Sequence, residues 1–130
     1  MIVLDASAAI EMLLRTSTGS RVEARVSSPG ESLHAPHLID LEVAQVLRRF
    51  AAAGAIAFAR GKEALEDLRD ISLVRYPHVV LLERIWELRD NLTAYDAAYV
   101  ALAEALDAPL LTCDRKLASP RSHRARIEVI

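Results

Sequence analysis

Short apolar runs alternate with longer amphipathic segments along the 130-residue chain. The short runs predict buried strands, because a strand covered on both faces of its sheet is apolar at nearly every position. We predict strands over residues 1–4, 32–35, 71–76, 110–113 and 127–130. Apolar residues at helical spacing predict helices over residues 6–15, 20–26, 38–53, 55–70, 79–89 and 94–106.

This alternation is typical of an α/β fold. We predict a three-layer α/β/α sandwich around a central parallel sheet of four to five short strands. In such sheets, ligands bind outside the carboxyl ends of the strands. Asp5 and Asp114 each follow the end of a predicted strand, so we expect functional chemistry there.

The composition fits a folded domain rather than a disordered chain, with 52% hydrophobic and 26% charged residues. The length predicts one domain over residues 1–130. The single cysteine, Cys113, cannot form an internal disulfide, which favours a reducing cytoplasm. We recognise no secretory leader and no apolar run long enough to span a bilayer, so we expect a soluble protein without a membrane partner.

Charge is unevenly distributed around the net value of −2. Residues 115–130 carry five basic residues against one acid, a net of +4, which leaves −6 on the preceding residues. An acidic metal pocket beside a basic phosphate-binding edge would produce this division. A solvated C-terminal segment would produce it as well.

Asp5 and Asp114 can both be helix N-caps, since each precedes a helical segment and a carboxylate accepts backbone N–H bonds there. At the ends of parallel strands, however, the two acids would face the same crevice. Thr112 stands two residues before Asp114, which places both on one side of the strand. A hydroxyl in that position can orient a carboxylate or a water.

Glu42 and Asp96 lie within predicted helices on or beside the apolar face. Glu42 accompanies the stripe Ile39, Val43, Val46 and Phe50, and a buried carboxylate must be paired, protonated or metal-bound. Arg49, seven residues on, offers an ion pair as the alternative to a metal. Asp96 can complete a capping box with Thr93, and it can also bind a metal, since a carboxylate has several lone pairs.

Four segments in order resemble a PIN domain, and more closely a VapC-type toxin of a toxin–antitoxin pair. They are Ile2-Val3-Leu4-Asp5-Ala6-Ser7, residues 38–47 around Glu42, residues 92–103 around Asp96, and Leu110-Leu111-Thr112-Cys113-Asp114. The resemblance extends over essentially the whole chain. Many relatives carry another acid two residues beyond the last aspartate, where this chain has Lys116, and this difference favours one tightly held cation over two.

The resemblance implies a Mg²⁺- or Mn²⁺-dependent endoribonuclease whose metal ligands are Asp5, Glu42, Asp96 and Asp114. A metal-activated water would cleave the RNA phosphodiester and leave 5′-phosphate and 3′-hydroxyl ends. Thr112 would assist by orienting a water or a carboxylate. The expected phosphate contacts are Arg115, Lys116, Arg121 and Arg124. The resemblance also implies a small antitoxin partner and a homodimer.

Other functions remain open at this point. A PIN-family nuclease of RNA processing or decay would carry the same acids. A non-catalytic protein-interaction module would carry them as caps and ion pairs, and it should show no metal-dependent thermal shift. A phosphorylated receiver domain fits poorly, because Asp5 stands alone after its strand and residues 72–76 end without an acid. The histidine spacing does not indicate zinc, and there is no glycine-rich phosphate loop.

Overall fold

Five parallel strands form the centre of the computed structural model, which describes residues 1–119 and 122–130. The strand order is β3-β2-β1-β4-β5. This confirms the predicted α/β fold with a parallel sheet. The strands are β1 (Ile2–Leu4), β2 (Leu33–Pro36), β3 (Leu73–Tyr76), β4 (Leu110–Thr112) and β5 (Ile127–Val129).

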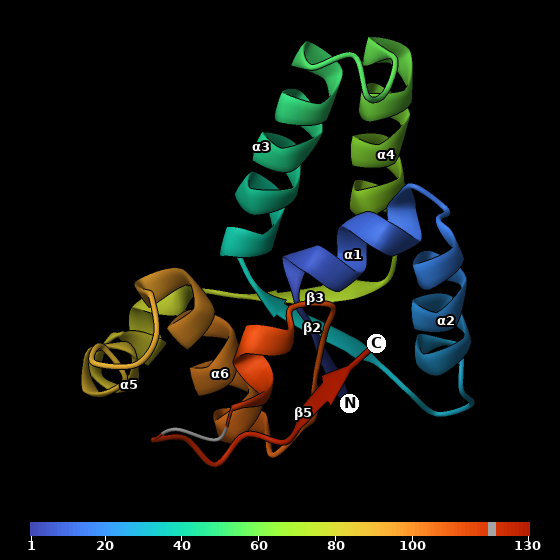
Figure 1. Ribbon diagram of the computed structural model, residues 1–130. Coiled ribbons are helices and arrows are strands. Elements are labelled where there is room, and N and C mark those ends of the chain that lie inside the picture. The colour runs from blue at the N-terminus through green and yellow to red at the C-terminus, as the bar shows by residue number, and fades with distance from the viewer. Residues whose placement is uncertain (120–121) are drawn as a thin grey trace.

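Helices cover both faces of the sheet (Figure 1). One layer holds α1 (Ala6–Leu13), α2 (Ser17–Val26), α3 (Leu38–Ala52) and α4 (Phe58–Asp70). The other holds the 3-10 helix η1 (His78–Leu81), α5 (Leu82–Glu87) and α6 (Ala94–Leu106), and a second 3-10 helix, η2 (Arg115–Ala118), follows β4. In Figure 1, α3 and α4 form a hairpin that projects away from the sheet. Within the described residues, no helix is both long and apolar enough to cross a membrane.

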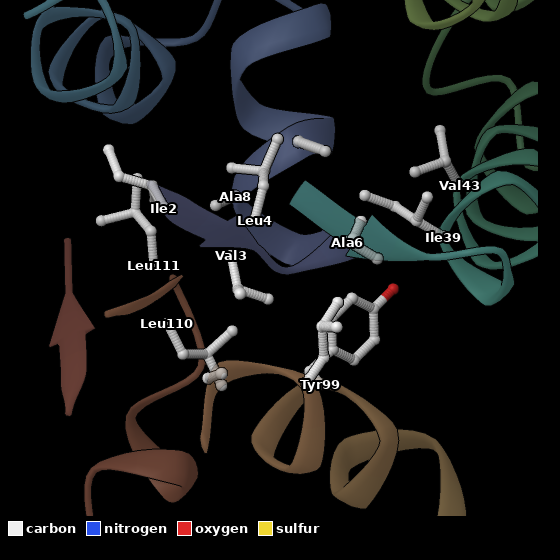
Figure 2. Close-up of a cluster of buried hydrophobic side chains, with 14 of the residues drawn as sticks. Ile2, Val3, Leu4, Ala6, Ala8, Ile39, Val43, Tyr99, Leu110 and Leu111 are labelled. Atoms are coloured by element: carbon white, nitrogen blue, oxygen red, sulfur yellow. The ribbon is translucent and has the colours of Figure 1, made fainter. Parts of the chain in front are cut away.

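The core lies on both faces of β1, whose three residues are fully buried. Figure 2 shows Ile2, Val3 and Leu4 between side chains of α1 and α3 on one side and Tyr99 of α6 on the other. The Ala-rich face of α6 packs closely against the sheet, since small side chains let helix and strand backbones approach. The central strand is therefore held from both layers.

The chain reverses its direction of winding between β1 and β4. Strands β2 and β3 lie on one side of β1, and β4 and β5 lie on the other. Such a switch point leaves a crevice at the carboxyl ends of the two central strands, where ligands bind in open α/β sheets. Asp5 directly follows β1 and Asp114 follows β4, so the fold brings both acids to this crevice.

Some predicted boundaries were wrong, for local reasons. Helix α1 ends at Leu13 because Arg15 adopts a positive φ. Helix α2 begins at Ser17, before the predicted residue 20, because the Thr16 side chain caps it by accepting the Gly19 N–H. The predicted helix over 79–89 divides into η1 and α5. In α3 the buried stripe continues through Leu47, and Phe50 is 36% exposed.

Gly19 allows α1 and α2 to cross closely, and we expect Gly19→Ala to destabilise the fold. A Cβ at this position would overlap the backbone carbonyl of Glu11, and backbone cannot move aside as a flexible side chain can. Overpacking of this kind costs about 1–3 kcal/mol, so the melting temperature should fall by roughly 4–12 °C.

Gly61→Ala, in α4, is the matched control for Gly19→Ala. Its added Cβ meets only Ile56 Cδ1, at an ordinary 3.5 Å. Because alanine favours helix, this variant should gain about 0.5–1 kcal/mol. Thermal unfolding should therefore show a lower melting temperature for Gly19→Ala and a higher one for Gly61→Ala than for the parent. Equal melting temperatures would contradict the proposed contact between the two helices.

Candidate metal-dependent active site

Asp5 is the most firmly held acid of the crevice. Its pairing follows from the register: Leu4 lies opposite Leu111, so Asp5 comes next to Thr112. Asp5 Oδ2 accepts hydrogen bonds from Ser7 Oγ at 2.6 Å and from Thr112 Oγ1 at 2.7 Å. Its Oδ1 accepts the Ala6 N–H at 2.8 Å. Asp5 is thus the N-cap of α1, and its carboxylate is held in one orientation by hydrogen bonds to both of its oxygens.

The hydroxyls of Ser7 and Thr112 join the two strand ends. Ser7 Oγ accepts the Cys113 N–H at 2.9 Å, and Thr112 Oγ1 accepts the Asp114 N–H at 3.0 Å. The two hydroxyl oxygens are themselves 3.2 Å apart. Because Thr112 is fully buried, this network has little freedom to rearrange, and it ties the position of Asp5 to the start of the segment that carries Asp114.

Glu42 is held by Tyr99 and not by Arg49. The Tyr99 hydroxyl donates to Glu42 Oε1 at 2.7 Å, from α6 to α3. Figure 2 shows the Tyr99 oxygen directed toward the side of the molecule where Ile39 and Val43 of α3 lie. Among the described residues Arg49 makes no ion pair with Glu42, so the alternative of an ordinary salt bridge is wrong in this structure.

Asp96 and Asp114 both lie at the starts of helices: the Asp114 carboxylate is itself a cap, whereas Asp96 takes part in a cap through its backbone N–H. Thr93 caps α6 by accepting the Asp96 N–H at 3.2 Å. Asp114 precedes η2, and its Oδ1 accepts the Lys116 N–H at 2.9 Å. Each carboxylate keeps lone pairs beyond these contacts. Capping and metal binding are therefore compatible at both positions.

The acids repel one another across the crevice. Burial raises the pKa of the Glu42 carboxyl, and the charges of Asp5 and Asp96 raise it further, whereas the Tyr99 hydrogen bond lowers it. Burial likewise raises the pKa of Asp96, together with the charges of Asp5 and Asp114, while hydrogen bonding by Thr93 and the charge of Lys116 lower it. Such unneutralised, part-buried like charges mark a site that favours a cation.

The four acids line one cleft of about 880 Å³. Its acidic lining residues are Asp5, Glu11, Glu42, Asp96 and Asp114. Its large apolar and aromatic lining residues are Ile10, Leu38, Leu41, Val46, Phe50 and Tyr95. The cleft therefore offers negative charge together with apolar and aromatic surface.

Of the predicted basic edge, the described residues Arg115, Lys116 and Arg124 do not line this cleft. Arg115 and Lys116 stand on η2, directly after Asp114, and both are exposed. The backbone N–H of Arg124 donates to Glu104 of α6, eight residues and about 12 Å beyond Asp96 along the helix. Arg121 lies outside the described residues. The phosphate-binding role of these residues stays a prediction.

A PIN domain model matches residues 2–121 of this chain. The chain belongs to the PIN domain family. Curated relatives of this PIN domain include Ribonuclease VapC9 of Mycobacterium tuberculosis, 47% identical over all of this chain and 98% of that protein. Ribonuclease VapC12 of the same organism is 40% identical over all of this chain and 99% of that protein. These full-length matches place the PIN domain among the VapC-type ribonucleases.

Solved structures have the same fold as this PIN domain. PAE2754 from Pyrobaculum aerophilum superposes with a TM-score of 0.73 and 24% identity, covering 97% of this chain and 87% of that one. VapC20 of Mycobacterium tuberculosis, described as a toxin that cleaves the sarcin-ricin loop, superposes with a TM-score of 0.70 and 13% identity. The match covers 96% of this chain and 99% of that one. VapBC2 from Rickettsia felis, solved with a promoter DNA fragment, superposes with a TM-score of 0.71 and 14% identity. The match covers 99% of this chain and 98% of that one.

The structure adds two residues whose importance was not predicted. Tyr99 was given no role from the sequence. The signal that could have found it is a phenol on an otherwise Ala- and Leu-rich helix face, since a buried hydroxyl needs a partner. Cys113 was expected in a buried strand, which is wrong: β4 ends at Thr112, and Cys113 lines the cleft, partly exposed. Burial still raises the pKa of its thiol, so it remains a poor nucleophile.

The residues of this PIN domain fit a divalent metal. All four acids offer hard oxygen ligands, which Mg²⁺ and Mn²⁺ prefer to nitrogen or sulfur. Within the described part of the chain, no three carboxylate, imidazole or thiol groups stand close enough to chelate one ion by themselves. A cation bound here would therefore retain several waters, which is usual for Mg²⁺.

We expect Tyr99→Phe to weaken metal binding and activity about 10–100-fold, the usual cost of losing a partner that orients a metal ligand. The phenylalanine ring fills the same volume and releases Glu42 from its hydrogen bond. Tyr95→Phe is the matched control on the same helix, because Tyr95 is 61% exposed. Titration of Mn²⁺ by thermal shift checks the prediction, and equal midpoints for both variants would contradict it.

Proposed function

We propose that this VapC-type ribonuclease is a metal-dependent endoribonuclease that acts as the toxin of a toxin–antitoxin pair. In this proposal residues 1–130 are one catalytic domain that works in the cytoplasm. The observation that carries the proposal is the convergence of four carboxylates, each from a different segment, on one cleft at the switch point of the sheet. The hydroxyl network around Asp5 holds the first of them in place.

Asp5, Glu42, Asp96 and Asp114 would hold Mg²⁺ or Mn²⁺ between β1, α3, α6 and η2. When bound, the cation supplies activation of a water and neutralises charge on the scissile phosphate. Ser7 and Thr112 keep Asp5 oriented by donating to one of its oxygens. Tyr99 occupies one oxygen of Glu42, and the other would be left for the cation. Lys116, whose charge acts on Asp96, would contact RNA phosphate.

An antitoxin and a second copy of the chain complete the proposal. Structural neighbours include a toxin–antitoxin complex from Klebsiella pneumoniae. In this chain the apolar lining of the cleft supports an antitoxin segment, since Leu41, one of the lining residues, is 74% exposed. Val80 and Trp86, on η1 and α5, are about as exposed and support a homodimer contact.

Cleavage of total cellular RNA tests the proposed function. The purified chain should cut RNA with Mg²⁺ or Mn²⁺ and stop when EDTA is added. Sequencing of the new 5′ ends would identify the substrate. Growth arrest on induction, relieved by co-expressing a short neighbouring reading frame, would support the toxin. Cleavage without growth arrest would instead favour a nuclease of RNA processing or decay, and absence of both metal binding and cleavage would leave an interaction module.

A further inference from the structure

Arg49 stands in the active-site cleft without a partner. It is exposed on α3, and no hydrogen bond or ion pair holds its guanidinium within the described residues. Most of the other described arginines are engaged: Arg25, Arg60, Arg75 and Arg84, for example, each bond a carboxylate or a backbone carbonyl. Arg49 therefore does not stabilise the fold through an ion pair, although five acids line the same cleft.

Charge within the cleft makes Arg49 unusual. Of the described residues that line the cleft, five are acids and Arg49 is the one that carries a positive side chain. An RNA strand is a polyanion, and its backbone must meet cations wherever it is not neutralised by metal. Helix geometry places Arg49 seven residues, or about 10 Å, beyond Glu42 on nearly the same face of α3.

We propose that Arg49 binds a phosphate of the RNA next to the one held at the acids, on the α3 side of the cleft. This inference rests on the proposed ribonuclease function. A guanidinium offers a planar pair of donors that suits phosphate. Lys116 stands on η2, two residues after Asp114, so Arg49 and Lys116 would hold the strand from two different elements. Arg49 is then a substrate-binding residue and takes no part in the chemical step.

Arg48 is a natural control for Arg49. It has the same charge and exposure and lies one position earlier on α3, which turns its side chain about 100° away. Its Nε donates to Gln45 Oε1 at 3.0 Å, and it does not line the cleft. Substituting either residue changes the net charge equally. A difference between the two variants therefore reports position and not overall charge.

Binding of a fluorescein-labelled unpaired RNA 12-mer by fluorescence polarisation tests the inference, in an Asp5→Asn background that prevents cleavage. Arg49→Ala should weaken binding about tenfold, reduce the salt slope by about 0.7, and be largely restored by Arg49→Lys. Arg48→Ala should change binding less than twofold. In the cleaving protein, Arg49→Ala should raise KM and leave kcat within about twofold.

Equal binding by the Arg49→Ala and Arg48→Ala proteins would overturn the inference, provided that the parent chain cleaves RNA. A parent chain that neither binds nor cleaves would instead overturn the proposed function. If Arg49→Ala binds RNA normally but no longer binds the neutralising antitoxin, Arg49 belongs to the protein interface and the inference is again wrong. Unchanged melting temperatures for both variants would exclude misfolding as the cause.

Discussion

Asp5→Asn should reduce RNA cleavage by on the order of 10²–10³-fold while leaving the protein folded. Asparagine keeps the shape of the side chain and removes its negative charge. Its NH₂ group must also face either the two hydroxyls that now donate to Oδ2 or the Ala6 N–H that donates to Oδ1, so one of these sets of hydrogen bonds must be rearranged. Asp5 therefore loses both its affinity for a cation and its fixed orientation.

Cleavage of total RNA at saturating Mn²⁺ is the measurement, together with the Mn²⁺-dependent rise in melting temperature. Asp90→Asn is the matched control, because Asp90 is exposed and belongs to no contact of the cleft. It should cut at the parental rate. Full activity in the Asp5→Asn protein would refute the metal mechanism, since Asp5 is the best-held acid of the site.

Asp96→Asn should combine a comparable loss of activity with a gain in stability when no metal is present. The carboxylate of Asp96 is half-buried near Asp5 and Asp114, and both charges raise its pKa. Removing one of these like charges relieves the repulsion. We expect a gain of about 0.5–1 kcal/mol, or roughly 2–4 °C in melting temperature, because solvent screens part of the interaction.

The gain should depend on pH in a defined direction. The folded chain binds the Asp96 proton more tightly than the unfolded chain does, because folding raises the pKa of this carboxyl above its ordinary 3.8. Folding is therefore penalised at pH values above the raised pKa, and the penalty disappears as the pH falls below 3.8. Asp96→Asn should stabilise the protein most at neutral pH and progressively less under acid conditions.

Melting temperatures in EDTA and in Mg²⁺, from neutral to acid pH, provide the comparison. The parent should gain stability from Mg²⁺ at neutral pH, and the Asp96→Asn protein should gain less. Asp107→Asn is the control on the same helix, because its side chain is 96% exposed and asparagine tolerates the left-handed backbone found there. A lower melting temperature for the Asp96→Asn protein in EDTA would contradict this prediction and show that the Asp96 carboxylate stabilises the start of α6.

Much of the fold followed from the sequence, because the apolar runs are short and the amphipathic segments between them are long. The strands around Leu4 and Leu111 could be predicted, and with them the positions of Asp5 and Asp114 at strand ends. Helix ends were less predictable. The apolar pattern continues past both helix ends. The actual ends are set by the Thr16 cap and by the positive φ of Arg15, which the apolar pattern does not report.

Within the site, residue types could be predicted better than contacts. The four acids stood out because carboxylates are rare on apolar faces and at buried strand ends. The bond from Tyr99 to Glu42 joins residues 57 apart in sequence, and no local spacing reports such a pairing. Glu42 and Arg49 illustrate the same difficulty: their seven-residue spacing suggested an ion pair, but α6 supplied a nearer partner.

The pairing of β1 with β4 has a consequence for the time at which activity arises. Asp5 bonds Thr112 across 107 residues, so the central pair of strands cannot form until nearly the whole chain has been made. A nascent or truncated chain ending before β4 carries three of the four acids but lacks the hydroxyl that fixes the first. We therefore expect the site to stay incomplete during translation until β4 has been made and can pair with β1.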